Sequence, residues 1–556
     1  MSAQPSWRWD REIALLAWFT TCVSMLSFLF YFRRGEILLY GDAVAHINIA
    51  RRVFDSRTPG LLQLGTVWLP LPHLLMIPFL LSNWMWKTGV GGSIPSMAAY
   101  VLGTIGIFRL VRDGLGSDAQ SALMVKSAAW LAAIIYATNP NLIYLQATAM
   151  TEALYLGLFI WAMVYFNEFV RESAKAEENT HPLAASSSLV KCGFCLLAAC
   201  LTRYDAWLLA AAMSVAALAV VLHTKRRGHR RGLAKFILIA AAAPTLWLAY
   251  NAIVYRNPLE FANGPYSAKA IEQRSPGAAH PGTHDLQTAF SYFLKSAELN
   301  LAAGNWQKLW LLLAAAGVIA ALTWKQTRSH LWPLVLLWIP LSFYSLSVAY
   351  GGVPIFMPVW WPFSYYNVRY GLELLPAFAV FVTLAFYFSA QMVQHRAFKF
   401  GAAAAVLIFV ATSFASTWSA PVCFTEAVVN SRDRISLERE LADFVKVLPP
   451  DSTVLMYLGD HVGALQQAGI PLRRVINEGN HRTWKQPVDL DGLWERALAS
   501  PAKYADFVIV FEGDPVSAAL LKDVQKQGLA PLAVIHTSHT SGQAKATIYR
   551  TYASAR

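Results

Sequence analysis

Charged residues are scarce in this sequence: they make up 14% of its 556 residues, whereas 56% are hydrophobic. Soluble domains carry about 25% charged residues, so the shortage excludes an ordinary soluble enzyme. The formal net charge is +13, but the basic residues stand mostly in short loops between apolar runs and form no single stripe. This pattern indicates membrane topology rather than nucleic-acid binding.

Cysteine is scarce as well, because five residues do not make a disulfide framework. Cys22, Cys192, Cys195 and Cys200 fall within apolar runs, and only Cys423 lies near a segment expected to face water. Cys192 and Cys195 have the spacing of a redox motif. Inside a hydrophobic helix, however, packing as small apolar side chains is the favoured interpretation.

Long apolar runs dominate what is present. Residues 12–32 can cross a hydrocarbon core of ~30 Å, and Arg33-Arg34 follow without a small-residue cleavage site, so we predict an uncleaved first transmembrane helix. About eleven transmembrane helices are predicted in all: 12–32, 93–112, 121–138, 150–170, 189–202, 205–223, 236–255, 306–324, 331–350, 371–390 and 400–418.

The segment 68–86 is apolar enough to insert, but three prolines interrupt it and Trp stands at both ends. We interpret it as re-entrant or interfacial, within a long first loop of residues 33–92. The basic residues of the other loops then place the N-terminus in the cytoplasm and this loop outside. The loop carries six basic residues of its own, but loops of this length obey the charge rule poorly. If 68–86 did span, the N-terminus would lie outside.

The sequence changes character at about residue 419. Short strand-like and helix-like segments alternate there, which predicts a small α/β domain. The strand-like segments are 453–457, 473–477, 506–513, 531–538 and 546–552. No Gly-rich fingerprint follows the first of them, so we assign no nucleotide. We therefore predict a polytopic α-helical membrane domain, residues 1–418, followed by an extracytoplasmic α/β domain, residues 419–556.

Polar residues gather at span ends on the predicted outer side. Asp42 and His46 lie four residues apart, on one face of a helix that starts just after Gly41. Asp42 is the candidate catalytic residue, because that helix is too apolar for a surface element, although Asp at a helix start also suits an N-cap. His46 is either a substrate contact or a packed histidine.

Three further places carry charge at membrane level, where charged groups are costly and are usually functional or paired. Glu152 opens the 150–170 span and also suits the positive end of its own helix. Arg203 and Asp205 lie between two spans and are equally well explained as a local ion pair. Arg369 leads into the 371–390 span, where a guanidinium can simply extend to the interface.

Two other patterns are weaker. His280, His284 and Asp285 have ligand-like spacing, but their loop is rich in Pro and Gly, and the zinc interpretation is weak. The aromatic run 359–366 fits an interfacial belt better than a stacking wall for a sugar or an isoprenoid. The residues therefore predict no metal site and no other cofactor.

These features together resemble a known superfamily. An acid in a long first outer loop, an acid opening a later span, an Arg-Tyr pair (Arg369-Tyr370) before a Pro-containing span, and a soluble domain after the last span are typical of GT-C-type integral-membrane glycosyltransferases. The sequence looks like relatives of protein O-mannosyltransferases and of the aminoarabinose transferase that acts on lipid A. The resemblance covers about residues 12–418, and its motifs are short and degenerate.

The resemblance implies roles for individual residues. The first-loop acid of such enzymes is the catalytic base, which corresponds to Asp42, and the basic residue that holds the donor phosphate corresponds to Arg369 or, as second choice, Arg203. The remaining expected substrate contacts are His46, Glu152, Asp205 and Tyr370. Many relatives have two adjacent acids in the first loop, whereas Ala43 follows Asp42 here, which leaves the use of a divalent metal open. The WWDYG motif of oligosaccharyltransferases is absent.

The expected reaction moves a sugar from a polyprenyl-phosphate donor to an acceptor hydroxyl on a glycan, lipid or protein outside the cytoplasm. A carboxylate within ~3 Å of that hydroxyl can act as general base, and guanidinium groups stabilise the leaving phosphate. The resemblance further implies inversion at the anomeric carbon and a bacterial plasma (inner) membrane. No nucleic acid is expected as a partner.

Two other functions are alternatives. A transporter, or a flippase for lipid-linked sugars, would also carry buried charges, but its site is expected at mid-span rather than at one face. A non-catalytic scaffold for envelope-polymer assembly would leave Asp42 and Arg369 replaceable.

Overall fold

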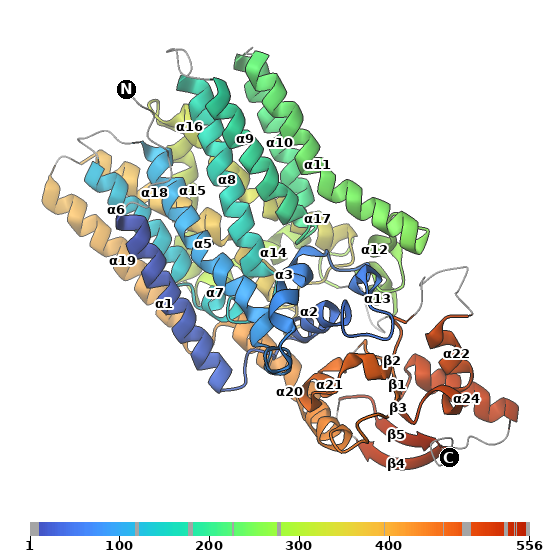
Figure 1. Ribbon diagram of the computed structural model, residues 1–556. Helices are drawn as coiled ribbons and strands as arrows, with labels where there is room; N and C mark the ends of the chain where they lie inside the picture. Colours follow the sequence, from blue (N-terminus) through green and yellow to red (C-terminus); the bar gives the residue numbers. More distant parts are fainter. Residues whose placement is uncertain are drawn as a thin grey trace.

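The chain folds into a bundle of long helices with a smaller, sheet-containing domain at one end (Figure 1). The computed structural model describes residues 11–116, 122–175, 182–224, 227–274, 280–393, 395–459, 461–480, 491–527, 532–538, 540 and 542–551. Residues 121, 531 and 552, at predicted element ends, and the basic residues 225 and 226 lie outside this range.

The predicted spans coincide with helices. These are α1 (Arg11–Arg33), α5 (Val90–Leu115), α6 (Ala122–Ala137), α8 (Glu152–Lys175), α9 (Pro182–Cys200), α10 (Asp205–Thr224), α11 (Arg227–Tyr255), α15 (Trp306–Thr323), α16 (Arg328–Leu331) running through η2 (Trp332–Trp338) into α17 (Ile339–Tyr350), α18 (Leu375–Gln391) and α19 (Arg396–Trp418). Within the described residues, nine helices are long and apolar enough to cross a membrane, and α6 and the apolar part of α9 are shorter. The chain is a multi-pass membrane protein.

The first loop contains only short helices: α2 (Gly41–Arg52), η1 (Leu61–Leu64), α3 (Leu71–Leu80) and α4 (Asn83–Thr88). The ambiguous segment 68–86 is thus split between α3 and α4. A ten-residue helix such as α3 is about 15 Å long, half of a hydrocarbon core. Pro70 precedes this helix and Pro78 lies inside it, which explains why no continuous span forms.

A fully buried helix stands at the centre of the bundle. The span from η3 (Val368–Leu374) through α18 is buried along its whole apolar window, whereas α1, at the bundle edge, is 22% buried. Because α18 is apolar on every side, it is stable only inside the bundle. It fixes η3, which begins the span, against α7 and α20, and Figure 1 shows α20 at the bundle end next to the sheet.

Other short helices of the bundle are α7 (Pro140–Leu145), α12 (Glu260–Asn263), α13 (Ala268–Arg274) and α14 (Leu286–Leu301). The C-terminal part contains α20 (Val422–Val445), β1 (Val454–Met456), α21 (Val462–Ala468), η4 (Leu472–Arg474), β2 (Val475–Ile476), α22 (Leu493–Ala499), α23 (Pro501–Tyr504), β3 (Phe507–Phe511), α24 (Pro515–Gln527), β4 (Leu532–Ser538) and β5 (Ala546–Thr551).

The C-terminal sheet confirms the α/β prediction. Its strand order is β2-β1-β3-β5-β4. The first three strands are parallel, with Val454 opposite Val475 and Phe507, while β5 is antiparallel to both β3 and β4. Every residue of β1 and β3 is buried, as expected for central strands covered on both faces.

The helix α20 belongs to both parts of the molecule. Near its start, the backbone N–H of Cys423 donates to Asn141 at 2.9 Å, and its carbonyl accepts from the Tyr40 hydroxyl at 2.8 Å. The other end packs against α21 of the C-terminal domain. The predicted division at residue 419 therefore precedes a helix whose first turns lie inside the membrane domain, and Cys423 is buried there rather than near water.

Candidate active site

Two arginines, Arg203 and Arg369, lie at the bundle end next to the C-terminal domain, and carboxylates from five separate elements surround them. The five carboxylates are Asp42 on α2, Glu152 on α8, Asp205 on α10, Glu373 on η3 and Glu426 on α20. We call these seven residues the ion cluster. Carboxylates exceed guanidinium groups by three, so the cluster is rich in acid.

Arg369 uses all three of its nitrogens on carboxylates. Its Nη2 donates to Asp42 at 2.6 Å, its Nε to Glu152 at 3.1 Å and its Nη1 to Glu426 at 2.9 Å. The side chain of Arg369 is 8% exposed and those of Glu152 and Glu426 are buried, whereas that of Asp42 is 41% exposed. Asp42 is therefore the open side of the ion cluster.

Arg203 binds the other members of the cluster. Its Nη2 lies 3.0 Å from Glu373, its Nε 3.4 Å from Asp205 and its Nη1 3.4 Å from Glu152. The Tyr344 hydroxyl donates to Glu373 at 2.8 Å and also lies within reach of Asp205. Glu152 Oε1 accepts from both arginines, so it joins the two halves of the cluster.

Tyr370 lies between the two guanidinium groups. The guanidinium carbons of Arg369 and Arg203 are 5.0 and 5.1 Å from its ring centroid. Cation–π contacts of this kind are worth more when water is excluded, and the Tyr344 ring packs against Tyr370 at 5.0 Å. The Arg-Tyr pair of the sequence motif is therefore part of the ion cluster's framework.

The backbone around Arg369 is held by side chains from other elements. Asn367 adopts a left-handed conformation, φ 57°, which Asn tolerates better than most residues. The N–H of Val368 then donates to Glu426 at 2.7 Å, and its carbonyl accepts from Asn300 at 2.8 Å. This arrangement aims the next side chain, Arg369, at the acids.

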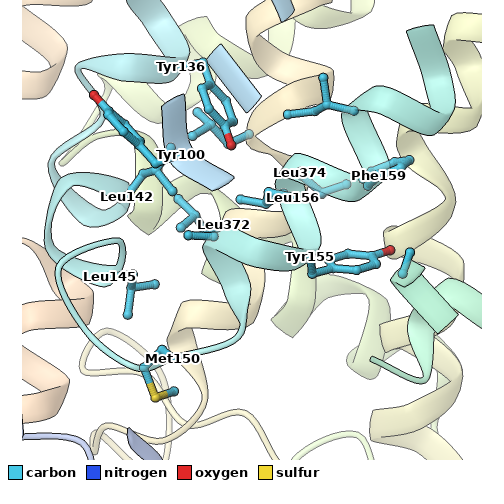
Figure 2. Packing of buried hydrophobic residues seen from close by; sticks show 14 of the residues in the cluster. Tyr100, Tyr136, Leu142, Leu145, Met150, Tyr155, Leu156, Phe159, Leu372 and Leu374 are labelled. Carbon is cyan, nitrogen blue, oxygen red and sulfur yellow. The ribbon is translucent and has the colours of Figure 1, made fainter. Parts of the chain in front are cut away.

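Tight packing behind the cluster fixes its depth. Gly371 lies directly against the backbone of α14 at Ser296 and Ala297, where a Cβ atom would overlap. Figure 2 shows Leu156 of α8 close to Leu374 of η3. The apolar faces of α8 and η3 thus hold Glu152 and Arg369 at one level.

Asp42 does not cap its helix. The N-cap of α2 is Tyr40 and makes no side-chain capping bond, while the Asp42 carboxylate points to Arg369. Tyr366, from the aromatic run 359–366, is half-exposed and lies near Asp42. Burial and the Asp42 charge raise the pKa of the Tyr366 hydroxyl. The N-cap alternative for Asp42 is therefore not the one observed.

His46 is packed rather than exposed. Its Nδ1 lies 2.9 Å from His73 Nε2, and its ring centroid is 4.7 Å from that of Trp68. Burial, with the positive charges of Arg369 and Arg203, lowers the pKa of His46 to about 3. His46 is thus a neutral imidazole within electrostatic reach of both arginines.

The structure brings together every residue named from the sequence as a candidate: Asp42, His46, Glu152, Arg203, Asp205, Arg369 and Tyr370. Arg203 and Asp205 do pair locally, but this contact is one of several. The alternative that Arg369 merely extends to the interface is not the one observed, because its guanidinium is buried among acids.

Two acids of the cluster, Glu373 and Glu426, have no counterpart in the sequence analysis. Glu373 stands four residues after Arg369, in the same motif, and that spacing was a usable signal. Glu426 follows the predicted domain boundary and was therefore assigned to water. Glu426 lies in the second turn of α20, which begins at Val422, and this part of the helix is inside the membrane domain.

The weak zinc pattern has a structural explanation. Asp285 caps α14, accepting from the backbone N–H groups of Gln287 and Thr288, and His280 pairs with Glu272 at 2.9 Å. Within the described residues, no group of three or more His, Cys, Asp or Glu side chains is arranged to hold a metal ion.

Comparison with known proteins identifies the fold. Two crystal structures of ArnT from Cupriavidus metallidurans, one bound to undecaprenyl phosphate and one in the apo state, align with TM-scores of 0.55. Their identities are 12% and 11%, and the alignments cover 97% and 98% of both chains. An Archaeoglobus fulgidus oligosaccharyltransferase aligns with a TM-score of 0.46 and 11% identity over 91% of this chain and 70% of its own.

No family model and no curated protein matches the sequence. At such identities the structural likeness concerns architecture alone. Because it extends over the whole chain, it includes both the helical bundle and the C-terminal domain. The chain thus has the overall fold of the two ArnT structures, which agrees with the fold that the resemblance in the sequence implied.

Proposed function

We propose that this protein is a membrane glycosyltransferase that moves a sugar from a polyprenyl-phosphate donor to an acceptor hydroxyl outside the cytoplasm. Asp42 is the general base, and Arg369, assisted by Arg203, binds the donor phosphate. The observation that carries the proposal is the position of Asp42. It is the half-exposed carboxylate at the open side of a buried ion cluster, in direct contact with Arg369.

A carboxylate in this position suits proton abstraction from a hydroxyl. General bases act at hydrogen-bond distance from the proton that they remove, and the exposed oxygen of Asp42 is accessible to an acceptor, unlike the buried oxygens of Glu152 and Glu426. Proton removal raises the nucleophilicity of the acceptor oxygen as it attacks the anomeric carbon. The bond from that carbon to the phosphate oxygen breaks at the same time.

The leaving group is a phosphate, whose developing charge a guanidinium stabilises through charge-assisted hydrogen bonds. Each of the three Arg369 nitrogens already donates to a carboxylate. We therefore propose an exchange in which the donor phosphate takes the Nη2 group of Arg369 from Asp42. Of the three partners, Asp42 is displaced most easily because it is the most exposed, and its release frees the base when the donor is in place.

The fold supports this assignment. One structure with the same architecture contains undecaprenyl phosphate, a lipid with an apolar tail for the bilayer and a phosphate for its surface. Asp42 and Glu426 of the ion cluster are on α2 and α20, and these two helices lie at the end of the bundle next to the sheet (Figure 1), which suits a phosphate at the membrane surface. We propose the plasma membrane as its location, with the N-terminus in the cytoplasm and the C-terminal domain outside.

The experiment reconstitutes the full chain in lipid vesicles with a panel of labelled polyprenyl-phosphate sugars and measures release of polyprenyl phosphate. Asp42→Asn keeps the shape and removes the base. Asp443→Asn is the control, because Asp443 lies on the exposed part of α20 and pairs only with Lys446 among the described residues. We expect turnover in the parent and the control, and a loss of ~10²-fold or more in Asp42→Asn.

Equal turnover in Asp42→Asn and the parent would move the base elsewhere, with Glu152 and Asp205 next to test. Movement of intact sugar-lipid to the opposite leaflet without release of polyprenyl phosphate would support the flippase alternative. We propose no resident cofactor, since a carboxylate and guanidinium groups supply the base and the phosphate contacts. Parallel assays with EDTA, and with added Mg²⁺ or Mn²⁺, measure any dependence on a divalent metal.

A further inference from the structure

Two buried histidines face each other beneath Asp42. His46, one helical turn after Asp42 on α2, lies with its Nδ1 2.9 Å from Nε2 of His73 on α3. The two side chains come from different helices of the first loop and both are buried, with His73 completely enclosed. Trp68 packs against the ring of His46. The two rings are held in place by packing, and the 2.9 Å between the facing nitrogens fits one hydrogen bond with a single proton.

The second nitrogen of His73 decides which ring donates. Its Nδ1 is buried and has no hydrogen-bond partner among the described residues. If His46 donated to His73, the neutral His73 would carry its proton on this Nδ1 and bury an N–H group without an acceptor. Orphaned buried N–H groups are rare and costly. The favoured arrangement therefore has His73 Nε2–H donating to His46 Nδ1.

Both imidazole rings are neutral at physiological pH. Burial and the charges of the two arginines lower the pKa of His46 to about 3. Burial, His46 and Arg52 hold the pKa of His73 well below its usual range. A neutral imidazole carries one proton. Since Nδ1 of His46 accepts, its single proton is on Nε2.

The Nε2 atom of His46 is not fully enclosed. Unlike Nδ1 of His73, it is not among the fully enclosed atoms without a partner, and it has no hydrogen bond within the described residues. Asp42 precedes His46 by one helical turn, so both side chains lie on one face of α2. The carboxylate of Asp42 and the Nε2–H group of His46 therefore lie on the same face of α2, and Arg369 acts on both.

We propose that His73 is a positioning residue that fixes His46 as its Nε2–H tautomer, and that His46 donates this hydrogen to a substrate oxygen beside Asp42. The oxygen belongs to the sugar or to the phosphate of the donor. A donor without charge can hold either group without competing with Asp42 for a proton. This inference deepens the proposed function and rests on it for the identity of the substrate, but the tautomer itself does not.

The first test is therefore independent of turnover. The full chain, labelled with ¹⁵N-histidine and reconstituted in vesicles, is measured by solid-state NMR, and the His46 signals are assigned by their loss in His46→Gln. We expect a protonated Nε2 and an unprotonated Nδ1 between pH 5 and 8. A proton on Nδ1, or an imidazolium within that range, would overturn the tautomer assignment. In His73→Leu, which removes the donor at similar volume, we expect a mixture of the two tautomers.

The second test uses side-chain amides as atomic substitutes. The Gln amide nitrogen can occupy the position of His Nε2, whereas the Asn amide matches Nδ1. We expect His46→Gln to keep kcat within about threefold and His46→Asn to lower it by about tenfold, the size of one hydrogen bond. His73→Gln retains a donor to Nδ1 and is expected to stay near the parent, while His73→Leu lowers kcat with little change in unfolding temperature.

The outcomes separate this inference from the proposed function. If the parent releases polyprenyl phosphate but His46→Asn equals His46→Gln, the donor role of His46 is wrong and the glycosyltransferase stands. If the parent is inactive with every donor while the NMR signals show the Nε2–H tautomer, the proposed function fails and the histidine pair stands. Equal kcat values for His73→Leu and His73→Gln would refute positioning by His73.

Discussion

Arg51, on α2, and Arg369, which bonds Asp42 of the same helix, are both buried arginines, yet their partners differ. Arg51 bonds one carboxylate, Asp55 at 2.8 Å, together with the Leu80 carbonyl and the Asn83 side chain. These acceptors are neutral except for Asp55, and all lie within the first loop. Arg369 bonds three carboxylates drawn from three distant elements, and one of these, Asp42, is 41% exposed.

The difference shows that burial alone does not identify a functional arginine. Arg51 is matched by one charge and enclosed, with both members of the ion pair at most 5% exposed, so no site for a ligand is left. Arg369 is surrounded by more carboxylates than guanidinium groups, and one side of this environment is open. Such an arrangement lowers folding stability, so stability alone does not explain it. The candidate site therefore differs from the structural Arg51–Asp55 contact in two ways. It has more carboxylates than guanidinium groups, and one of its carboxylates, Asp42, is accessible.

The largest expected effect is the loss of turnover when Asp42, the exposed member of the ion cluster, is replaced. Asp42→Asn should abolish most turnover, by ~10²-fold or more, because the amide cannot accept the proton of an acceptor hydroxyl. The unfolding temperature should change little, since half-exposed ion pairs contribute little to stability. Release of polyprenyl phosphate and thermal unfolding in the same vesicles measure both. A large loss of stability in Asp42→Asn would instead make the Asp42–Arg369 contact structural, like that of Arg51.

The next effect tests the comparison directly by making one substitution at both arginines. Arg369→Lys should lower kcat/KM by ~10- to 100-fold, because an ammonium cannot replace a planar fork that binds several oxygens. Arg51→Lys loses similar hydrogen bonds and should destabilise the fold by about 1–3 kcal/mol, with turnover within about threefold of the parent. Steady-state kinetics and unfolding curves give both numbers. Equal losses of activity in the two variants would remove the distinction between the regions.

The sequence predicts the spans and several site residues, but not the contacts between those residues. The spans were predictable because apolar runs reflect the bilayer thickness directly, and Asp42, Glu152 and Arg369 were found because charge at membrane level needs a reason. Which charges meet was not predictable. The two helix starts that carry Asp42 and Glu426 are 384 residues apart in the chain, by the difference of their numbers, and only the tertiary packing brings both to Arg369.

The two missed acids show the limit in physical terms. Glu373 lies one helical turn after Arg369 but bonds Arg203 instead, because the 3₁₀ geometry of η3 and the packing at Gly371 set the direction of each side chain. Glu426 was missed because the predicted boundary at residue 419 rests on composition. Composition shows where charged residues become frequent, but not where a helix leaves the bundle. Local patterns specify elements, whereas the ion cluster is specified by how these elements pack.

A third prediction compares two buried acids of one helix. Glu426 and Glu438 are both on α20, and each bonds an arginine, Arg369 at 2.9 Å and Arg434 at 2.8 Å. Both Glu→Gln variants should lose about 1–3 kcal/mol of stability, since a charge-assisted hydrogen bond is weakened. Only Glu426→Gln should also lower kcat, by about tenfold, because Glu426 holds Arg369 in place. A fall in kcat of the same size in Glu438→Gln would mean that α20 acts only through overall stability.

The smallest expected effect is the response of the site region to acid. In the folded protein the pKa of His46 is lowered to about 3, whereas an unfolded histidine titrates near 6.5. Between these values the unfolded chain binds a proton that the folded one excludes, so stability is complete above about pH 6.5 and falls as the pH is lowered, by at most ~1.4 kcal/mol per pH unit. His46→Gln removes this difference in proton binding between the folded and unfolded chain, and it should flatten the decline in unfolding temperature between pH 6.5 and 4.5. Arg51→Lys should leave the slope unchanged, because Arg51 bonds Asp55, Leu80 and Asn83 and not the two histidines. An identical acid slope in His46→Gln and the parent would show that His46 can be protonated in the folded state, and the neutral imidazole beside Asp42 would have to be abandoned.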